Sequence, residues 1–446
     1  MSAKLENLVI CDAVRTPFSH GTGLKKYSSI HLLELVIRAL IERNRLKPDS
    51  VSGVVSGCIQ QDTRATNIAR IAGLRAGLSE SSADYSVQAN CNSGFVGLLS
   101  AIGGIAADVG GLYIVSGVES MSNYGFRLND KTNKYGSVFE INDLLKTGGE
   151  EFLNNFGLVN CLIEGLTDDE NDLSMIEIGE IMANCFSISR EEQDKYTLGQ
   201  LQKAVDAVTE GIFSKYTTPV GDMEKDAYPL NRKRLLKRPE QISRAAAVFG
   251  EENPELNPAR FYEKHKKHLE RLGIKKIIPS VTMYNSCIPG DGAGGCILTT
   301  EENARSLGLK PLLRIISWAA IGVDPVIMGI GPAAAAHKMF SEPKTKRAKG
   351  IDMDKLDIIE IHEAFASQVL SALKESENKY GIKFNTEKMN PYGGSLAYTH
   401  PLGATNFRLI IDVLTMFDKN SSAKYAMTCG CAGGGQGTSV LFERYK

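Results

Sequence analysis

The sequence lacks the features that mark membrane proteins and nucleic-acid-binding proteins. It contains no run of about 18 uncharged apolar residues, so we expect no membrane-spanning helix. Its formal net charge of −1 over 446 residues gives no electrostatic attraction for nucleic acid or for an anionic membrane surface. With 43% hydrophobic and 23% charged residues, the composition is that of an ordinary globular protein.

No targeting segment is recognisable at either end. A strand-like apolar run at residues 8–11 begins without a basic and apolar leader before it, so we expect no secretory signal. The last residues, Glu443-Arg444-Tyr445-Lys446, do not form a peroxisomal tripeptide. We therefore expect a cytoplasmic protein, and a processed mitochondrial form is the alternative.

The cysteines lack the pattern of a disulfide framework or of a structural zinc site. There are nine of them, an odd number, and their spacing is irregular, which favours free thiols in a reducing compartment. Cys429 and Cys431 form one close pair, and no second close pair accompanies them. Because structural zinc sites usually combine two such pairs, we expect no bound metal.

Short apolar runs alternate with helical patterns at both ends of the chain, which is typical of an α/β fold. In the first part, strands are expected at residues 8–11, 51–55, 85–88 and 112–115, and helices at 31–46 and 94–107. In the last part, strands are expected at residues 314–320, 358–361, 423–428 and 440–443, and helices at 363–374 and 403–416. Two similar parts indicate a duplicated domain.

The middle of the chain is more polar and mainly helical. Ser189 and Glu192 have the spacing of a capping box, which predicts that a helix begins there. We interpret residues 119–275 as an insertion. Residues 1–118 with 276–303 would then form an N-terminal half, and residues 304–446 a C-terminal half.

Cys91 and His400 open two segments that look like copies of one another. Each is followed three residues later by a glycine, Gly94 or Gly403, and then by an apolar run suited to a buried helix. If the halves pack about a pseudo-twofold axis, the thiol and the imidazole meet at facing helix N-termini. A helix N-terminus and a nearby imidazole lower the pKa of a thiol, so the pattern predicts an activated cysteine nucleophile.

Four separated blocks carry a family resemblance. They are Cys91-Asn92-Ser93, His362-Glu363-Ala364-Phe365, Thr399-His400-Pro401 and Cys431-Ala432-Gly433. In this order and spacing they closely resemble the four signature blocks of the thiolase family. Arg15-Thr16-Pro17, the block from Gly117 to Ser122 and the block from Asn390 to Ser395 fit the same pattern. The His-Glu-Ala-Phe form resembles the thiolase (beta) subunit of fatty-acid-oxidation trifunctional complexes, whereas most other thiolases have Asn in place of that His.

The resemblance implies a fold, a reaction and partners. The fold would be the duplicated, five-layered α-β-α-β-α thiolase fold with a mainly helical loop domain over the active site. The reaction would be the cleavage of a 3-ketoacyl-CoA by coenzyme A to acetyl-CoA and a shortened acyl-CoA, in fatty-acid β-oxidation. Coenzyme A would be a co-substrate, and no cofactor would be bound permanently. The protein would form a homodimer or a dimer of dimers, with a hydratase/dehydrogenase alpha subunit as a further partner.

The resemblance also assigns roles to the residues of the four blocks. Cys91 would be the nucleophile that carries the acyl group, and His400 the base that takes its proton. His362 and His400 would line one oxyanion hole, and the Gly433 and Cys91 amides a second one. Cys431 would donate or remove the proton on acetyl-CoA. Glu363 could orient a histidine or cap the next helix, and we favour a structural role.

Contacts with coenzyme A are expected at two places. Cys287 stands where the family often has a serine that contacts pantetheine. Arg232, Arg234 and Arg238 form a basic stretch that could meet the phosphates, although such a stretch is more often only a solvated surface. The run from Gly433 to Gly437 lets the backbone approach a ligand, but no Gly-Lys-Ser/Thr follows, which excludes a P-loop.

Two residues near His400 depart from the family pattern. Thr399 and Asn406 stand where glycine is usual, so the sequence leaves the acyl-chain preference open.

Three alternative functions remain. A short-chain, biosynthetic acetoacetyl-CoA thiolase would use the same residues. A decarboxylating ketoacyl synthase lacks the second cysteine, so Cys431 counts against it. An inactive acyl-CoA-binding scaffold subunit is the alternative of another class, suggested by Thr399.

Overall fold

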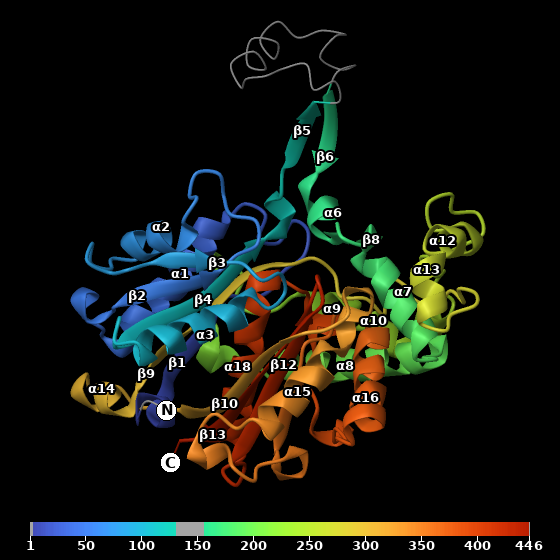
Figure 1. The fold of residues 1–446 in the computed structure, drawn as a ribbon. Helices are drawn as coiled ribbons and strands as arrows, with labels where there is room; N and C mark the ends of the chain where they lie inside the picture. Colours follow the sequence, from blue (N-terminus) through green and yellow to red (C-terminus); the bar gives the residue numbers. More distant parts are fainter. Residues whose placement is uncertain (1–2, 131–155, 446) are drawn as a thin grey trace, which may run out of the picture.

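The computed structural model describes residues 3–130 and 156–445, and its centre is a long mixed sheet (Figure 1). The strands are ordered β11-β12-β13-β10-β1-β9-β4-β2-β3. Their bounds are β1 Leu8–Arg15, β2 Gly53–Gly57, β3 Tyr85–Val87, β4 Leu112–Ser120, β9 Asp291–Thr300, β10 Leu313–Gly322, β11 Ile358–Ile361, β12 Tyr425–Ala432 and β13 Gln436–Arg444. The β1–β10 pairing that joins the two halves is short, with Val9 opposite Arg314 and Ile10 opposite Leu313.

Alternating side chains of the strands belong to different apolar layers. Val54 and Ile114 pack with the outer helices α1 (Ser29–Asn44) and α2 (Ile68–Arg75), whereas their neighbours Val55 and Val115 pack into the middle of the molecule. That middle layer is formed by α3 (Ser93–Ala106) and α18 (Thr405–Lys419). Such strands are buried on both faces, and this explains why they are almost continuously hydrophobic in the sequence.

The second half repeats this arrangement. On the outer side, α15 (Gly331–Ser341) packs on β10 and β13, and α16 (Ala366–Tyr380) packs beside α15. The order is therefore helices, sheet, helices, sheet, helices, with α3 and α18 between the two parts of the sheet (Figure 1). The predicted five-layered α/β fold is confirmed.

The expected elements occur near their predicted bounds, but α2, β9 and α15 were not predicted from the sequence. The strand β9 is rich in glycine, a composition that normally weakens a strand. The structure shows why glycine is needed there. A Cβ on Gly292 would lie 2.4 Å from a ring carbon of Phe18, and one on Gly294 would lie 2.7 Å from Cβ of Phe407.

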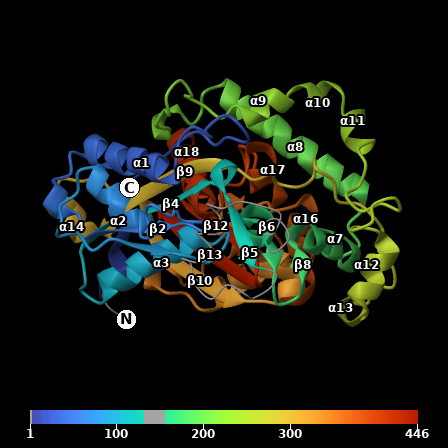
Figure 2. The same ribbon diagram turned by 90° about the horizontal axis from the view of Figure 1, so that it is seen from above.

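Helices predominate in the segment between β4 and β9 (Figure 2). The predicted capping box is confirmed, because Ser189 and Glu192 bond reciprocally at the start of α8 (Arg190–Thr209). At the other end of the segment a hairpin of β5 (Phe126–Asp130) and β6 (Phe156–Asn160) projects from the body (Figure 1). Residues 131–155 lie outside the described residues, and the proposed division at residues 119–275 stays a prediction.

The other α-helices and strands of the described residues are mostly short. Their bounds are α6 Cys161–Gly165, β7 Thr167–Asp168, β8 Leu173–Ser174, α7 Met175–Cys185, α9 Tyr228–Arg232, α10 Arg234–Lys237, α11 Glu240–Ser243, α12 Pro258–Lys264, α13 Lys266–Arg271, α14 Glu301–Ser306 and α17 Ser395–Tyr398.

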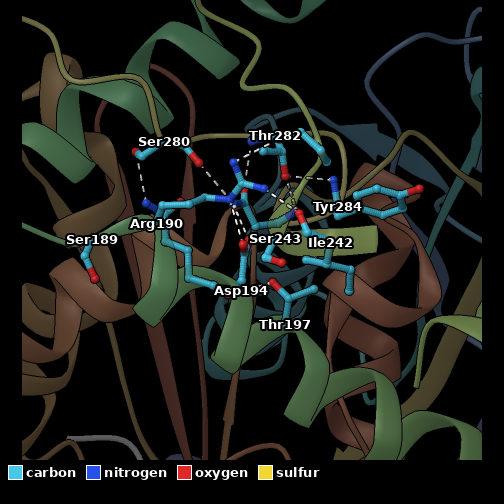
Figure 3. A network of polar contacts seen from close by, with 12 residues as sticks. Ser189, Arg190, Asp194, Thr197, Ile242, Ser243, Ser280, Thr282 and Tyr284 are labelled. Carbon is cyan, nitrogen blue, oxygen red and sulfur yellow. Dashed lines mark hydrogen bonds and ion pairs between the residues drawn. The ribbon is translucent and has the colours of Figure 1, made fainter. Parts of the chain in front are cut away.

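Polar contacts fix the segment between β4 and β9 to β1 and to the chain just before β9. Arg190 pairs with Asp194 one turn later in α8 and donates to the carbonyl of Ile242 (Figure 3). Asp194 in turn accepts a hydrogen bond from Asn285 Nδ2 at 3.3 Å. The buried Arg15 at the end of β1 makes a two-pronged pair with Asp226, at 2.8 and 2.6 Å. These contacts fix Asp226 against the end of β1 and α8 against Asn285.

None of the helices in the described part of the chain is both long enough and apolar enough to cross a membrane.

The loop that follows His400 approaches the first half at glycine contacts. A Cβ on Gly117 in β4 would lie 1.9 Å from the carbonyl oxygen of Gly403, and one on Gly94 in α3 would lie 2.7 Å from it. A Cβ on Gly403 would lie 2.5 Å from the carbonyl oxygen of Gly57. Real Cβ atoms do not approach backbone oxygens so closely, so any side chain here would push the loop away. Glycine at these positions therefore brings the His400 loop against the start of α3.

Substitution of two glycines on α3 tests this close approach. Gly94→Ala would place Cβ against Gly403 and should lower the free energy of unfolding by about 1–3 kcal/mol, the usual effect of overpacking. A Cβ on Gly103 would have no other atom within 4 Å, so Gly103→Ala should instead raise stability by about 0.5–1 kcal/mol. Urea unfolding of both variants, followed by circular dichroism, measures the difference. Equal effects of the two substitutions would contradict the close approach.

Candidate active site

Cys91 and His400 meet in the middle of the molecule, as their mirrored sequence contexts predicted. Cys91 lies in the turn before α3, and His400 lies in the turn before α18. His362 follows β11 and joins them, so that the thiol and one ring nitrogen of each histidine lie within 4.8 Å of one another. The ring centroids of His362 and His400 are 4.1 Å apart. Residues from three distant parts of the chain thus form one cluster.

Hydrogen bonds fix the orientation of both histidines. Nδ1 of His400 lies 2.7 Å from the hydroxyl of Thr405, which itself donates to the carbonyl of Pro401. A hydroxyl proton used in this way fits the tautomer in which Nδ1 of His400 donates to Thr405 and Nε2 is free to accept a proton. Nδ1 of His362 lies 3.1 Å from Oγ of Ser395. Nε2 of each ring is buried and has no hydrogen-bond partner in the described residues.

Burial keeps the thiol and the imidazoles uncharged in the free protein. Desolvation raises the pKa of Cys91 to about 12, against a smaller opposite effect of the Gly433 amide. Burial lowers the pKa of His400 to about 3, and the charge of Arg408 adds to this effect. The pKa of His362 is also lowered, chiefly by burial. The expectation of a lowered thiol pKa is therefore wrong for the free protein, because desolvation outweighs the helix N-terminus.

Gly433 contacts Cys91, and Cys431 lies near enough for the two thiols to affect each other's ionisation. The backbone N–H of Gly433 donates to the Cys91 thiol, and Asn90 Nδ2 donates to the Gly433 carbonyl at 2.9 Å. Cys431 is buried at the end of β12, and burial together with the nearby thiols of Cys91 and Cys287 raises its pKa. The chain then turns through Gly434, whose φ of +80° favours glycine. The structure thus brings together the thiols and the amide that the sequence singled out.

A cavity of about 290 Å³ opens onto Cys91 and His400. Cys287 lines it, and its other walls are mostly the apolar side chains of Met121, Ile163, Leu166, Met175, Ile176, Met283, Ile288, Pro289, Met328, Phe365 and Leu402. A second cavity, of about 170 Å³, reaches Cys91 from the side of Gly433 and contains Asp168 and Asp169. A ligand can therefore approach the thiol through apolar surroundings.

The basic stretch divides into one buried and two exposed arginines. Arg232 is buried and donates hydrogen bonds to the carbonyls of Leu396, at 2.8 Å, and Tyr284, at 3.3 Å. Because its guanidinium is buried and bonded within the protein, the expectation that Arg232 contacts the coenzyme A phosphates is wrong. Arg234 and Arg238 are exposed, and their contact with the phosphates stays a prediction.

Glu363 has a structural role, as expected. Its carboxylate accepts hydrogen bonds from Tyr196 at 2.8 Å and from Asn390 at 2.6 Å, and it also accepts one from the Leu396 amide. It neither touches a histidine ring by a hydrogen bond nor caps α16, whose N-cap residue is Phe365. The carboxylate instead ties α8 to the segment that leads to His400.

Glu119 is a buried residue of the site for which sequence reasoning assigned no role. It accepts hydrogen bonds from the Ile59 amide at 2.6 Å, from the hydroxyl of Tyr124 and from the Gly403 amide. Burial raises its pKa to about 7, and its charge raises the pKa of Cys91. Glu119 lies in the Gly117–Ser122 block that matched the family pattern, and this match was the available signal.

Both departures from the family pattern have structural consequences. Thr399 has φ +141° and ψ 174°, a backbone conformation adopted almost only by glycine, and its buried hydroxyl has no partner in the described residues. Gly290 makes room for its side chain, because a Cβ there would lie 2.4 Å from Oγ1 of Thr399. Asn406 accepts a hydrogen bond from the Phe95 amide at 3.2 Å and so joins α18 to α3.

Replacement of Thr399 tests whether the backbone beside His400 is strained. Thr399→Gly relieves strain of about 1–3 kcal/mol, whereas Thr399→Ala removes the hydroxyl and keeps the Cβ that opposes this conformation. The glycine variant should therefore be more stable than the alanine variant by about 1–2 kcal/mol. Thermal unfolding of the three proteins checks the order. An alanine variant as stable as the glycine variant would contradict a strained backbone.

Comparisons with known proteins extend over the whole chain. Residues 8–242 match the model of the thiolase N-terminal domain, and residues 309–444 match that of the thiolase C-terminal domain. The chain is 32% identical over 445 residues to a β-ketoadipyl-CoA thiolase of Pseudomonas putida, covering 99% of this chain and 100% of that protein. It is 29% identical over 443 residues to a probable acetyl-CoA acyltransferase of Staphylococcus epidermidis, with coverage of 99% and 100%.

Solved structures agree with the sequence comparisons. An acetyl-CoA acetyltransferase of Bacillus anthracis superposes with a TM-score of 0.81 at 27% identity, and human mitochondrial 3-ketoacyl-CoA thiolase with 0.81 at 26%. Each alignment covers 100% of both chains. A similar structure of the human enzyme, at 27% identity and a TM-score of 0.81, is a complex with CoA; it covers 100% of this chain and 99% of that one. The chain belongs to the thiolase family, whose members transfer acyl groups to and from coenzyme A.

Proposed function

We propose that this thiolase cleaves 3-ketoacyl-CoA with an apolar acyl chain, using Cys91 as the nucleophile. The observation that carries the proposal is the apolar cavity that opens onto the Cys91 thiol and the His400 ring. A 3-ketoacyl thioester that enters this cavity brings its 3-keto carbon to the thiol. The reaction is the thiolysis of fatty-acid β-oxidation, and the same residues run the reverse condensation.

The first half-reaction begins with proton transfer from Cys91 to His400. Both groups are neutral in the free protein, so the proton moves to the free Nε2 as the sulfur attacks the keto carbon. The Gly433 amide, already bonded to the sulfur, lies where it can stabilise the oxyanion that forms. Breaking the C2–C3 bond then leaves the acyl group on Cys91 and an acetyl-CoA enolate, which takes a proton from Cys431.

The second half-reaction returns the acyl group to coenzyme A. Its thiol gives a proton to the Cys431 thiolate and attacks the acyl-cysteine, and the released Cys91 sulfur recovers its own proton from His400. In the first half-reaction, Nε2 of His400 becomes a donor once it holds the Cys91 proton, and with Nε2 of His362 beside it can stabilise the thioester oxygen of the acetyl-CoA enolate. An apolar setting strengthens both oxyanion contacts, since the effective dielectric constant is low there.

The cavity lining supports an apolar acyl chain over a charged one. Several of the relatives are named β-ketoadipyl-CoA thiolases. The acyl group of β-ketoadipyl-CoA carries a carboxylate at its far end. No lysine or arginine occurs among the described residues that line the cavity at Cys91. A carboxylate buried there without a partner would lose several kcal/mol of solvation, roughly as other unpaired buried charges do.

Assembly and partners are part of the same proposal. The family's homodimer or dimer of dimers is the proposed state. We also propose a complex with an enoyl-CoA hydratase/3-hydroxyacyl-CoA dehydrogenase alpha subunit. Its only support is the His-Glu-Ala-Phe block that begins at His362. The second candidate function is the short-chain acetoacetyl-CoA thiolase, which the same cluster of cysteines and histidines would serve.

Thiolysis measured across a series of substrates tests the proposed function. The purified protein is given acetoacetyl-CoA, longer unbranched 3-ketoacyl-CoA thioesters and 3-ketoadipyl-CoA, and loss of the 3-keto thioester is followed by absorbance. We expect kcat/KM for the medium or long chains to exceed that for 3-ketoadipyl-CoA by at least about 100-fold, because an unpaired buried carboxylate is rejected strongly. A preference for 3-ketoadipyl-CoA would overturn the proposal. Activity with acetoacetyl-CoA alone would favour the short-chain alternative.

A further inference from the structure

Cys91, His362 and His400 have the composition of a transition-metal site. Their sulfur and ring nitrogens lie within 4.8 Å of one another, and they are the one group of this kind found among the described residues. Thiolate sulfur and imidazole nitrogen are the ligands that Zn²⁺ prefers in proteins. Such a site is invisible in the sequence, because its members are widely separated along the chain and lack the close spacing of a zinc motif.

The surroundings of the two histidines match those of metal ligands. Histidines that bind metal usually hold their other ring nitrogen in a hydrogen bond, which fixes the orientation of the ring. Here Nδ1 of His400 is held by Thr405 at 2.7 Å, and Nδ1 of His362 by Ser395 at 3.1 Å. Both Nε2 atoms are buried and unpartnered in the described part of the chain. No lysine or arginine among the described residues lines the cavity above them, and the nearby buried Arg408, whose charge acts on both imidazoles, is paired with Asp412.

We propose that Cys91, His362 and His400 together bind Zn²⁺ reversibly, and that the bound ion inhibits the enzyme. Binding releases the Cys91 proton to solvent and forms bonds from Zn²⁺ to the thiolate sulfur and to one nitrogen of each imidazole. Water or a substrate group completes the tetrahedral set. A coordinated thiolate cannot attack a carbonyl, and a coordinated His400 cannot take a proton. The binding stands on geometry alone, whereas the inhibition rests on the proposed function.

His362 makes this a property of the present chain. With the asparagine of the more usual family pattern, the cluster would keep one thiolate and one imidazole, which hold Zn²⁺ weakly. The second imidazole supplies the third protein ligand, the number found in zinc sites that keep one position open. Substrate and ion compete, because the nucleophilic sulfur and the free ring nitrogens serve both.

Metal titration of the whole protein tests the binding without any turnover. Zn²⁺ is titrated by calorimetry and Co²⁺ by its absorption spectrum, in chelator-treated buffer. We expect one site per chain, with a thiolate-to-cobalt charge-transfer band. His362→Asn should weaken Zn²⁺ binding by at least about 10-fold. Loss of a residue that only hydrogen-bonds to a metal ligand already lowers the affinity by about that factor, and loss of the ligand itself should lower it further. His337→Asn is the matched control, because His337 is exposed on α15 and should leave the affinity unchanged.

Inhibition is measured separately by thiolysis at increasing Zn²⁺. We expect inhibition of the wild type that EDTA reverses and that added acyl-CoA opposes, and a correspondingly higher Zn²⁺ requirement for the residual activity of His362→Asn. Unchanged Zn²⁺ affinity in His362→Asn, or the absence of a thiolate-to-cobalt band, would overturn the metal site. Tight binding with full thiolysis would overturn the inhibition. A protein that binds Zn²⁺ through this cluster but cleaves no 3-ketoacyl-CoA would leave the site standing and refute the proposed function instead.

Discussion

The close approach of the loop after His400 to the start of α3 is the constraint on which the site depends. Backbone meets backbone there, around the carbonyl of Gly403, with Gly94 and Gly117 leaving the space that a side chain would fill. Glu119 fastens the same loop by accepting a hydrogen bond from the Gly403 amide. The two halves of the duplicated fold are thereby locked at the point where each contributes a reactive group. A shift of about 1 Å would separate the thiol from the imidazole, and such shifts impair catalysis severely.

Burial accompanies that arrangement, and it sets the chemistry. Both His400 and Cys91 are neutral in the free protein, since each would lose solvation by ionising. Charge then develops as the substrate reacts, where the Gly433 amide and the histidine rings can stabilise it. The resting protein therefore avoids an exposed, oxidisable thiolate and still has a base within reach. The same apolar wall that discourages ionisation accommodates an apolar acyl chain.

The sequence predicted most of the strands and the meeting of Cys91 with His400, because both leave local signals, whereas the order of the layers was implied by the family resemblance. Apolar runs marked most strands, and the mirrored contexts of Cys91 and His400 marked the facing helices. The strand β9 was missed, since its glycines are explained by contacts with Phe18 and Phe407 that are distant in sequence. The sequence pattern also predicted a lowered pKa for Cys91, whereas burial raises it. A helix N-terminus is visible in a sequence, whereas the extent of desolvation depends on packing from several elements.

Side-chain environments were harder to predict than positions. Arg232 looked like part of a basic surface, yet its guanidinium is buried against two carbonyls. Thr399, in contrast, was recognised from the sequence as an anomaly, and its glycine-like backbone explains why.

The proposed reaction requires a covalent intermediate on Cys91, and mass spectrometry detects such an intermediate directly. The protein is mixed with an acyl-CoA, quenched in acid and digested, and the peptides are searched for the mass of the acyl group. We predict a thioester on the peptide that contains Cys91 and none on the same peptide of the Cys91→Ser variant. An acyl group found on Cys287 or Cys431 instead, or turnover without any acylated peptide, would contradict the assignment of Cys91 as the nucleophile.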